Sequence, residues 1–377
     1  MYDIAVVGGG LSGLSSAIQL AKAGLNVVLL EKKAYPFHRV CGEYISLETL
    51  PFFKTKLDFN PFDHGAVMIN QLTISSPKGS TIKLPLDLGG FGISRFHLDF
   101  LLKKIAQESG VTIFDKTNVL NIEQKNSHFE IKTNRQGILK STMAIGAFGK
   151  RSNLDRSLKR SSFYQRSPYI GVKHHIRIAD FMLENEIALH NFQDGYCGIS
   201  RVEKGIFCLC YLSHRKNLKQ AGNIPTLEKS VLQKNPFLKT IFNEAEFVWE
   251  KPLVINEISF EKKTLKENGV WLSGDSAGMI TPLCGNGMAM AIHSSYLISN
   301  AILDIFQHNK TETIAFQEYE KQWQKHFSTR LKIGRNIQKM FGNPFLTEIL
   351  VRSLKHLPPV ANQLIKLTHG QDFLEKK

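Results

Sequence analysis

Three glycines near the N-terminus are spaced so that a polypeptide backbone can approach a phosphate group closely. Gly8, Gly10 and Gly13 form a G-x-G-x-x-G pattern directly after the apolar run of residues 4–7. In such a turn the first glycine permits the tight bend, and the second leaves room for a pyrophosphate. The third lets the following helix pack closely against the strand. The pattern therefore predicts a dinucleotide-binding turn.

The elements that must hold this turn are also present in the sequence. Residues 4–7 predict a buried strand, and the apolar spacing from Leu11 onward predicts a helix that ends at Gly24. Residues 26–30 predict a second buried strand, which closes on Glu31 where an acid accepts hydrogen bonds from an adenosine ribose. A strand-to-helix turn without a ligand is the alternative, and the agreement of these features favours the dinucleotide site.

The segment after the second strand carries a further group of reactive and charged residues. Arg39, Cys41, Gly42, Glu43 and Ser46 form an R-x-C-G-E-x-x-S pattern. A guanidinium here could neutralise pyrophosphate charge, with a solvated loop charge as the alternative. Cys41 could be reactive, and the alternative is that it only packs as a small apolar side chain. Behind an N-terminal G-x-G-x-x-G, this pattern resembles the geranylgeranyl reductase group of the p-hydroxybenzoate hydroxylase-like FAD oxidoreductases.

The resemblance implies roles for individual residues. In that family the basic residue at the position of Arg39 lies against the FAD phosphates and ribose, and a cysteine at the position of Cys41 lies near the isoalloxazine. The backbone near Val119 would lie beside adenine. Arg95 begins a segment that resembles the family's R-x-x-L-D motif, whose arginine contacts FAD. We expect Asp99 of this motif to serve the first turn of its helix.

A second resemblance to the family lies near residue 275. A strand over residues 269–273 ends in Gly274-Asp275, and residues 281–288 start a helix, as in the family's G-D-A-A and P-x-x-G-x-G segments. In the family the aspartate contacts the ribitol chain and the helix start approaches the flavin pyrimidine. A helix N-terminus would stabilise negative charge on the N1–C2–O2 edge of a reduced flavin. The order of the two segments favours FAD over NAD.

These motifs together define the predicted cofactor site. The predicted cofactor-binding residues are Gly8, Gly10, Leu11, Ser12, Gly13, Glu31, Lys32, Arg39, Arg95, Val119, Gly274, Asp275, Gly285, Gly287 and Met288.

One position departs from the family. Residues 144–152 match the family's G-A-D-G-x-x-S sequence, with Phe148 in place of the aspartate. In related hydroxylases this motif is associated with FAD and NADPH, so Phe148 argues against standard nicotinamide-driven hydroxylation. NAD(P)H, a ferredoxin and a flavodoxin remain open as external electron donors.

The candidate catalytic residues are Cys41 and Tyr196. Residues 195–200 resemble the strand that carries an aromatic motif in geranylgeranyl reductases. The Tyr196 phenol is protonated at neutral pH, so it could donate a proton while flavin N5 delivers hydride. His174 and His175 are a less favoured acid-base pair, because adjacent strand residues face opposite sides.

The expected fold class is α/β, with a Rossmann-like FAD-binding domain of the GR2 or p-hydroxybenzoate hydroxylase type. The expected discontinuous FAD-binding domain comprises residues 1–64, 87–165 and 261–312. Residues 65–86 and 166–260 alternate in polarity between turns and predict an inserted, β-rich antiparallel substrate domain. Residues 313–377 predict a helical C-terminal region, with helices from 313, over 345–357 and over 360–367.

Composition limits the environment and the partners. The 377 residues carry a formal charge of +15, with the basic residues scattered and no nucleic-acid recognition motif. Surface solubility, an anionic membrane surface and an acidic substrate are the open explanations. No long uninterrupted apolar segment or signal peptide is evident, and the five cysteines lack a framework spacing. We expect a cytoplasmic protein with reduced thiols and no metal, whose alternative location is the inner face of the membrane.

The predicted function follows from these observations. We expect an FAD-dependent oxidoreductase that reduces or dehydrogenates a carbon-carbon bond of a bulky apolar substrate, of isoprenoid, lipid or polyketide type. Its partners would be this small molecule and an electron-donor protein. An FAD-dependent monooxygenase of an aromatic or polyketide substrate is the main alternative. A flavin halogenase, whose tryptophan-and-proline signature is absent, and a non-enzymatic lipid or prenyl carrier are lower alternatives.

Overall fold

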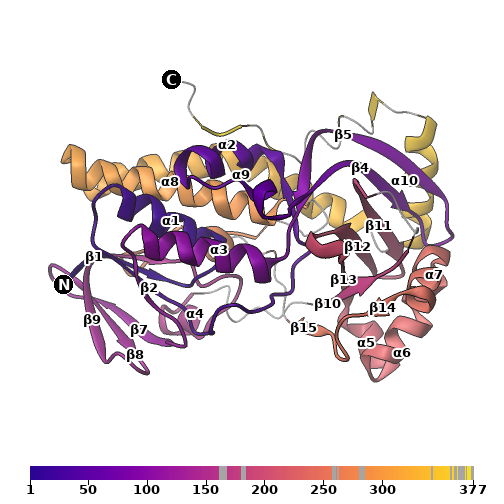
Figure 1. The fold of residues 1–377 in the computed structure, drawn as a ribbon, viewed down its shortest axis with the longest axis horizontal. Helices are drawn as coiled ribbons and strands as arrows, with labels where there is room; N and C mark the ends of the chain where they lie inside the picture. The colour runs from indigo at the N-terminus through magenta and orange to yellow at the C-terminus, as the bar shows by residue number, and fades with distance from the viewer. Residues whose placement is uncertain are drawn as a thin grey trace.

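Two β-sheets lie side by side along the long axis of the molecule (Figure 1). The computed structural model describes residues 1–160, 168–179, 184–256, 260, 263–279, 285–340, 343–356, 359–360, 363, 370 and 372–374, without the side chains of 337–340. We call the first sheet, built on the N-terminal strand, the nucleotide sheet. We call the second sheet the lid sheet.

The nucleotide sheet has a parallel centre. Its strand order is β16-β17-β9-β1-β2-β6, and β8 joins β7 to β9. The strands are β1 (Tyr2–Val7), β2 (Val27–Leu30), β6 (Thr112–Phe114), β7 (Val119–Gln124), β8 (Phe129–Thr133), β9 (Ile138–Gly146), β16 (Lys266–Glu267) and β17 (Val270–Leu272). β1 pairs in parallel with β2 and β9. All four residues of β2 are buried, as expected for a parallel strand that is covered on both faces.

Helices cover the nucleotide sheet in two layers (Figure 1). α1 (Leu11–Lys22) lies on β1 and β2 and packs against α3 (Arg95–Glu108) and α8 (Gly287–His308). α9 (Glu312–Met340) packs outside α8. α8 is long and apolar enough to cross a membrane, yet 61% of its most apolar window is buried inside the fold. That burial is typical of a core helix. α2 (Leu50–Lys56) and α4 (Asn153–Ser157) are short.

The lid sheet is mixed. Its strand order is β14-β10-β13-β12-β11-β4-β5-β3, and β15 pairs with β10. The strands are β3 (Tyr44–Ser46), β4 (Val67–Ser75), β5 (Thr81–Gly92), β10 (Tyr169–Arg177), β11 (Glu186–Phe192), β12 (Gly195–Arg201), β13 (Phe207–His214), β14 (Glu246–Phe247) and β15 (Leu253–Asn256). The pairing of β4 with β11 is parallel, whereas the other described pairings in this sheet are antiparallel.

The lid sheet includes more of the N-terminal chain than the sequence predicted. β3 and the last residues of β5 pair with each other in this sheet, although residues 44–46 and 87–92 were assigned to the nucleotide-binding part. β3 has only three residues, and a strand this short is too short for its alternation of apolar and polar residues to be detected.

Three helices interrupt the region that was predicted to be β-rich. They are α5 (Arg215–Ala221), α6 (Ile224–Ser230) and α7 (Pro236–Glu244). Their apolar residues pack against one face of the lid sheet, for example Leu238 and Ile241 in the same cluster as Cys197 and Ile199. Asn235 caps α7 by accepting hydrogen bonds from the N–H groups of Phe237 and Leu238. An Asn at the N-cap followed by Pro at the first helical position is a helix-start signal, and it was not used when the region was predicted to be β-rich.

The C-terminal region is helical over most of its described part. α9 begins at Glu312, and α10 (Pro344–His356) packs Val351 and Leu354 against Ile82 and Leu84 of β5. The predicted third helix over residues 360–367 lies mostly outside the described residues.

Candidate functional site

A cavity of about 550 Å³ is lined by residues of both sheets. On the nucleotide side the lining comes from the turn after β1, the end of β2, the loop after β9 and the segment after β17. On the lid side it comes from β4, β5 and β10 to β13. The cavity therefore joins the two predicted glycine motifs to one face of the lid sheet.

The first glycine motif fits a pyrophosphate. Gly8 has φ of +111°, and a Cβ atom there would overlap the carbonyl of Ala147. A Cβ atom on Gly13 would overlap the carbonyl oxygen of Gly8, so this glycine permits close packing of α1. Gly10 has neither constraint, because the nearest atom to its Cβ position is Nη2 of Arg95 at 3.7 Å. Its missing side chain leaves open space in the cavity, as a ligand that approaches the backbone requires.

The two predicted motifs meet in space. Ser12 Oγ at the start of α1 lies 2.6 Å from Ser273 Oγ at the end of β17. Gly274 has φ of +62°, and a Cβ atom on it would lie 2.9 Å from Cβ of Ser12. Asp275 and the start of α8 line the cavity beside this junction. Residues separated by most of the chain thus form one continuous wall.

Two guanidinium groups lie beside the glycine turn. Arg95 binds Asp99 through two hydrogen bonds, of 2.7 and 2.8 Å. Arg39 Nε donates to the same carboxylate at 3.0 Å, and its Nη2 donates to Glu31 at 3.2 Å. Burial alone would lower the pKa of Arg95, but Asp99 raises it, so the group stays charged. Asp99 is expected to serve the first turn of its helix, and it binds Arg95 there; it also binds Arg39 of a distant segment, which the sequence did not predict.

Glu31 is already engaged with the backbone. Its carboxylate accepts hydrogen bonds from the N–H groups of Gly9, at 2.9 Å, and Lys33, at 3.0 Å. A carboxylate oxygen can accept two hydrogen bonds, and Glu31 Oε1 accepts one, from Lys33. These contacts therefore orient Glu31 and leave acceptor capacity towards the cavity that it lines.

The lid side of the cavity is mainly apolar. Its apolar residues are Leu72, Leu86, Ile187, Leu189, Tyr196, Leu212, Leu253, Val254 and Ile255. Met279 of the segment after β17 also lines the cavity and packs with Tyr196 and Leu212. Polar groups are few here and include Ser200, Cys210 and Cys41. An apolar wall with a few polar groups is typical of a small-molecule site.

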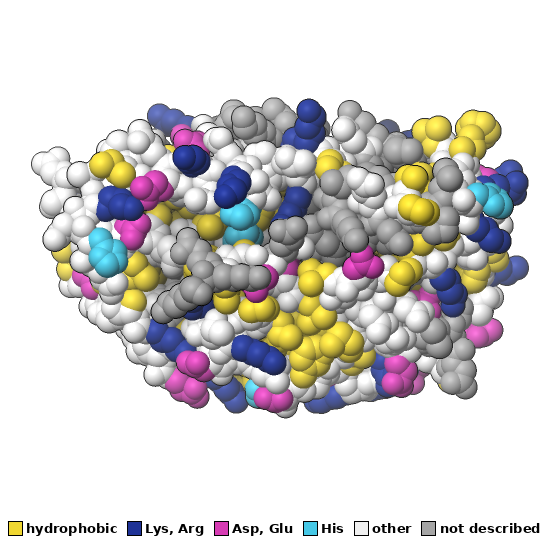
Figure 2. All heavy atoms as spheres, turned by 90° about the horizontal axis from the view of Figure 1, so that it is seen from above, with side chains coloured by type: hydrophobic (Ala, Val, Ile, Leu, Met, Phe, Trp, Pro, Cys, Tyr) yellow, Lys and Arg dark blue, Asp and Glu magenta, His cyan; other side chains and the backbone are white. Residues whose placement is uncertain are grey.

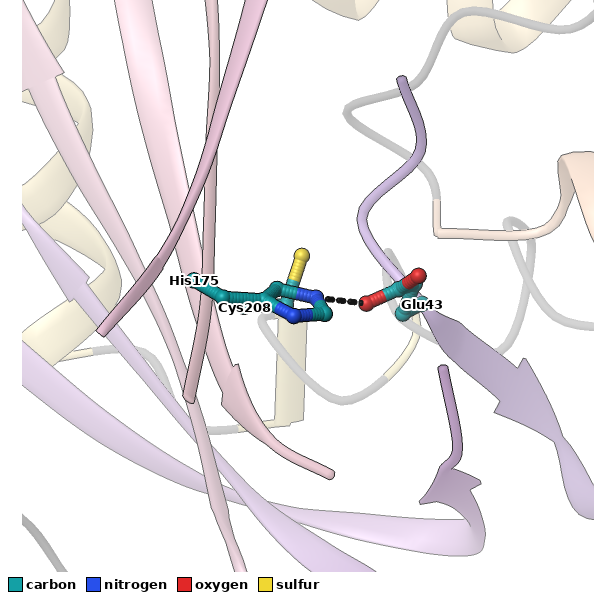
Figure 3. Close-up of side chains that lie close together, drawn as sticks. All are labelled: Glu43, His175 and Cys208. Carbon is teal, nitrogen blue, oxygen red and sulfur yellow. Dashed lines mark hydrogen bonds and ion pairs between the residues drawn. The ribbon is translucent and has the colours of Figure 1, made fainter. Parts of the chain in front are cut away.

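A buried ionic cluster connects the two sides (Figure 3). Glu43 is fully buried and binds Lys173 through one carboxylate oxygen and His175 Nε2, at 2.6 Å, through the other. The N–H of Arg95 donates to Glu43 at 2.7 Å. Burial would raise the pKa of Glu43, but Lys173 and then His175 lower it to about 2. Glu43 also raises the pKa of Lys173 against the effect of burial, so the pair is ionised.

The lid sheet also holds the backbone next to Glu43. Lys173 Nζ donates to the carbonyl of Arg39 at 3.3 Å, Cys208 Sγ to that of Cys41 at 3.2 Å, and Ser200 Oγ to that of Gly42 at 3.2 Å. Residues 39–43 are therefore fixed between the glycine turn and the lid sheet.

Metal-ligand chemistry is a second interpretation of this cluster. The side-chain ligand atoms of Glu43, His175 and Cys208 lie within 4.8 Å of one another. However, the Lys173 ammonium is bound to the same carboxylate, and burial raises the pKa of the Cys208 thiol well above its ordinary value. A cation would have to displace an ammonium and deprotonate that thiol, so the residues fit an ion-pair network better.

The predicted site residues fall close together. Every predicted cofactor residue except Gly13 lines the cavity, and so do Cys41 and Tyr196. Residues 281–284 of the second motif lie outside the described residues. His174 binds Glu228 at 2.8 Å on the face opposite to His175, as strand alternation predicts.

Sequence patterns missed several residues of the site. The ion pair of Lys173 with Glu43 was not predicted, and neither was the grouping of Glu43, His175 and Cys208. In both cases the residues come from distant segments of the chain. Lys150 also lines the cavity. It follows the G-A-F-G sequence directly, but that motif predicts no role for it. Lys263 donates to the carbonyls of Lys150 and Asp275, both at 2.8 Å, and burial lowers its pKa to about 8.

Comparisons with known families identify the nucleotide segment. The sequence model of the FAD-dependent oxidoreductase family matches residues 3–39, and that of squalene epoxidase matches residues 208–335. The first match covers β1, α1 and β2 with the glycine turn. The fold and this segment are those of FAD flavoproteins, and the cofactor of this superfamily is FAD.

Two curated relatives represent different reactions. The chain is 21% identical to the tryptophan 2-halogenase of Chondromyces crocatus, over 86% of this chain and 65% of the halogenase. It therefore spans slightly less than two thirds of that protein. It is 23% identical to the digeranylgeranylglycerophospholipid reductase of Methanocaldococcus jannaschii, over 94% of this chain and 92% of the reductase.

Solved structures show the same division. A flavin-dependent brominase superposes with a TM-score of 0.81 at 16% identity, covering 97% of this chain and 93% of the brominase. A geranylgeranyl bacteriochlorophyll reductase-like protein from Thermoplasma acidophilum superposes with a TM-score of 0.76 at 20% identity, covering 99% and 93%. These likenesses establish the fold that reductases and halogenases share.

Proposed function

The chain has the fold and the nucleotide segment of FAD-dependent oxidoreductases, and from this premise we propose that it reduces or dehydrogenates a carbon-carbon bond of a bulky apolar substrate. The observation that carries the proposal is the cavity, whose FAD-motif side continues into an apolar wall of the lid sheet. The near-complete mutual coverage with a digeranylgeranylglycerophospholipid reductase supports this reaction class. When bound, FAD would supply hydride transfer at its N5 atom.

The chain's own residues would bind and orient both reactants. Gly10 and the first turn of α1 would accept the pyrophosphate, and Arg39 and Arg95 would balance its charge. The apolar side chains of the lid sheet would exclude water from the substrate. Tyr196 is buried and lines the cavity, so its phenol is our candidate proton donor, with Cys41 as a second cavity residue.

Oxygen-dependent chemistry is the second candidate. The halogenases among the relatives and the solved structures favour it. The tryptophan-and-proline signature of flavin halogenases is absent from the sequence. Phe148, which lines the cavity, replaces an aspartate associated with NADPH use in related hydroxylases, so we propose a protein donor such as ferredoxin or flavodoxin for the reductase.

The decisive experiment is to purify the protein, record its visible spectrum and follow flavin reduction by NADH, NADPH and dithionite. We expect a yellow protein that dithionite reduces and NADPH reduces slowly. Fast reduction by NADPH that substrate stimulates, or a halogenated product when a halide and an aromatic substrate are supplied, would favour the second candidate. A colourless protein that takes up no added FAD would refute both.

We also propose reversible docking at an anionic membrane surface. The outer face of α10 exposes Phe345 by 72%, Leu346 by 41% and Ile349 by 47%, and Arg352 and Lys355 are exposed on the same helix. Apolar and basic side chains lie next to one another at the right-hand end of the face in Figure 2, the end that carries α10 in Figure 1. An apolar face flanked by basic residues fits a lipid interface.

A further inference from the structure

Lys150 is held rigidly in the wall of the cavity. It lies in the loop between β9 and α4 and lines the cavity. Its carbonyl accepts the hydrogen bond from Lys263. The N–H of the preceding Gly149 donates to Ser276 Oγ at 2.8 Å. The loop is therefore tied to the segment that carries Asp275, and the lysine side chain extends from a fixed backbone.

Among the residues that the structure describes, the Lys150 ammonium makes no hydrogen bond or ion pair. Burial lowers its pKa, and the groups that act in the opposite direction are Asp275, Cys210 and Cys41. An ammonium removed from water is costly unless an acceptor compensates it. A bound anion can supply that compensation.

Lys150 and Cys210 of β13 line the same cavity and interact electrostatically. Cys210 is the cross-strand partner of Gly198 on β12. Along β12, Tyr196, Gly198 and Ser200 line the cavity, whereas the intervening residues pack towards the helices on the other face. The charged lysine and the glycine therefore belong to the same part of the cavity.

The fold does not require glycine at position 198. Its φ is not in the left-handed region, and a Cβ atom would lie 3.5 Å from Leu189 Cδ2 and 3.7 Å from the carbonyl of Cys210, which is ordinary contact. Gly195 on the same strand differs, because a Cβ atom there would overlap Leu212 and Phe192. Glycine within a strand lowers stability, so an open surface is the remaining explanation for Gly198.

We propose that this part of the cavity binds an amphipathic substrate whose apolar body lies across Gly198 and whose anionic oxygen pairs with Lys150. The inference rests on the proposed function and narrows its substrate class to apolar molecules with one acidic group, such as a carboxylate or a phosphate. The same anionic oxygen could come from FAD itself. The experiment separates these sources.

The test uses two probes with the same apolar body, geranylgeranoic acid and geranylgeraniol, titrated calorimetrically into the FAD-loaded protein. We expect the wild type to bind the acid more tightly than the alcohol by roughly tenfold or more. Lys150→Met should remove this preference without changing FAD affinity. Lys229→Met, which removes an exposed lysine on α6, should keep the preference.

The glycine is tested with the same probes. Gly198→Leu should weaken both by roughly tenfold or more, because its side chain would fill the surface on which the apolar body lies. Gly198→Ala should bind both nearly as well as the wild type, since a single methyl group fits. FAD binding should be the same in all three proteins.

Three outcomes would overturn the inference. They are a wild type without acid preference, a Lys150→Met variant that loses FAD affinity while it keeps the acid preference, and a Gly198→Leu variant that binds both probes normally. A protein that takes up no FAD would instead refute the proposed function. The acid and alcohol titrations can be made without FAD, so they would still decide the role of Lys150.

Discussion

Gly10 shows how one missing side chain can reveal a ligand. Its neighbours Gly8 and Gly13 are required by the protein's own packing, whereas Gly10 faces open cavity. Gly8 and Gly13 are therefore needed for folding, whereas Gly10 is needed for cofactor binding.

We expect Gly10→Val to fold and to lose FAD. The new side chain would occupy the pyrophosphate position and weaken FAD affinity by about 10- to 100-fold or more, the range that overpacking of a site produces. The measurement is FAD affinity by flavin fluorescence, with circular dichroism to verify folding. Gly13→Val is the contrasting variant, because its Cβ atom would overlap the Gly8 carbonyl and folding itself should fail. A yellow Gly10→Val protein would contradict the pyrophosphate assignment.

Glu43 is a residue whose ionisation should control acid stability. Its pKa is lowered from 4.5 to about 2 in the folded protein. A carboxylate with a lowered folded-state pKa stabilises the fold above its unfolded pKa, and this contribution disappears as the pH falls from about 4.5 to about 2. A shift of this size corresponds to about 3 kcal/mol.

Glu43→Gln should therefore lower the free energy of unfolding at neutral pH by roughly 3–5 kcal/mol, because it leaves the Lys173 ammonium buried without its carboxylate. It should also reduce the loss of stability in acid. Urea denaturation at a series of pH values measures both effects. Glu130→Gln is the matched control, since Glu130 forms its ion pair with Lys140 at the surface. Identical acid profiles for the wild type and Glu43→Gln would disprove the assignment.

At the scale of the element, local patterns predicted what local interactions determine. β1, α1 and β2 were predicted from apolar spacing and glycines, and they occur where expected. β3 and the helices α5 to α7 were not predicted. β3 has three residues and exists because β5 lies beside it, so its own sequence carries too little periodicity.

The candidate site follows the same division. Glycines and Glu31 were recognised because backbone geometry at a nucleotide restricts residue type locally. The partners of Glu43 were not, because Lys173, His175 and the loop of residues 39–43 meet only after the lid sheet has formed. The contact between Asp99 and Arg39 was not predicted for the same reason, since Arg39 belongs to another segment.

At the scale of the whole molecule, the basic residues behind the charge of +15 are scattered along the sequence. Basic and acidic side chains are interspersed over the face seen in Figure 2. Scattered charge gives weak attraction to any anionic surface, and each Lys or Arg close to such a surface contributes about 1 kcal/mol. The exposed apolar residues of α10 would then decide where contact is made.

We expect the protein to sediment with vesicles that contain phosphatidylglycerol at low salt and to be released at high salt. Replacing Phe345 and Ile349 by serine should reduce binding by roughly tenfold or more, because each large apolar side chain loses about 1.5–3 kcal/mol of burial. Because Phe345 and Ile349 are exposed, the serine variants should still fold, and a loss of vesicle binding can be attributed to the lost contact. Equal binding to neutral and anionic vesicles, or no binding, would show that the charge serves solubility alone.

The parallel pairing of β4 with β11 has a consequence for how the chain is made. On the ribosome, each paired residue of β4 emerges 115 residues before its partner on β11, so one edge of the β4–β5 hairpin stays unpaired meanwhile. The nucleotide sheet is likewise incomplete until β17 has been synthesised and can pair with β9. Long-range pairings of this kind fold slowly and expose strand edges in the meantime. Nascent chains should therefore depend on chaperones, and no continuous fragment contains all the strands of one sheet without strands of the other.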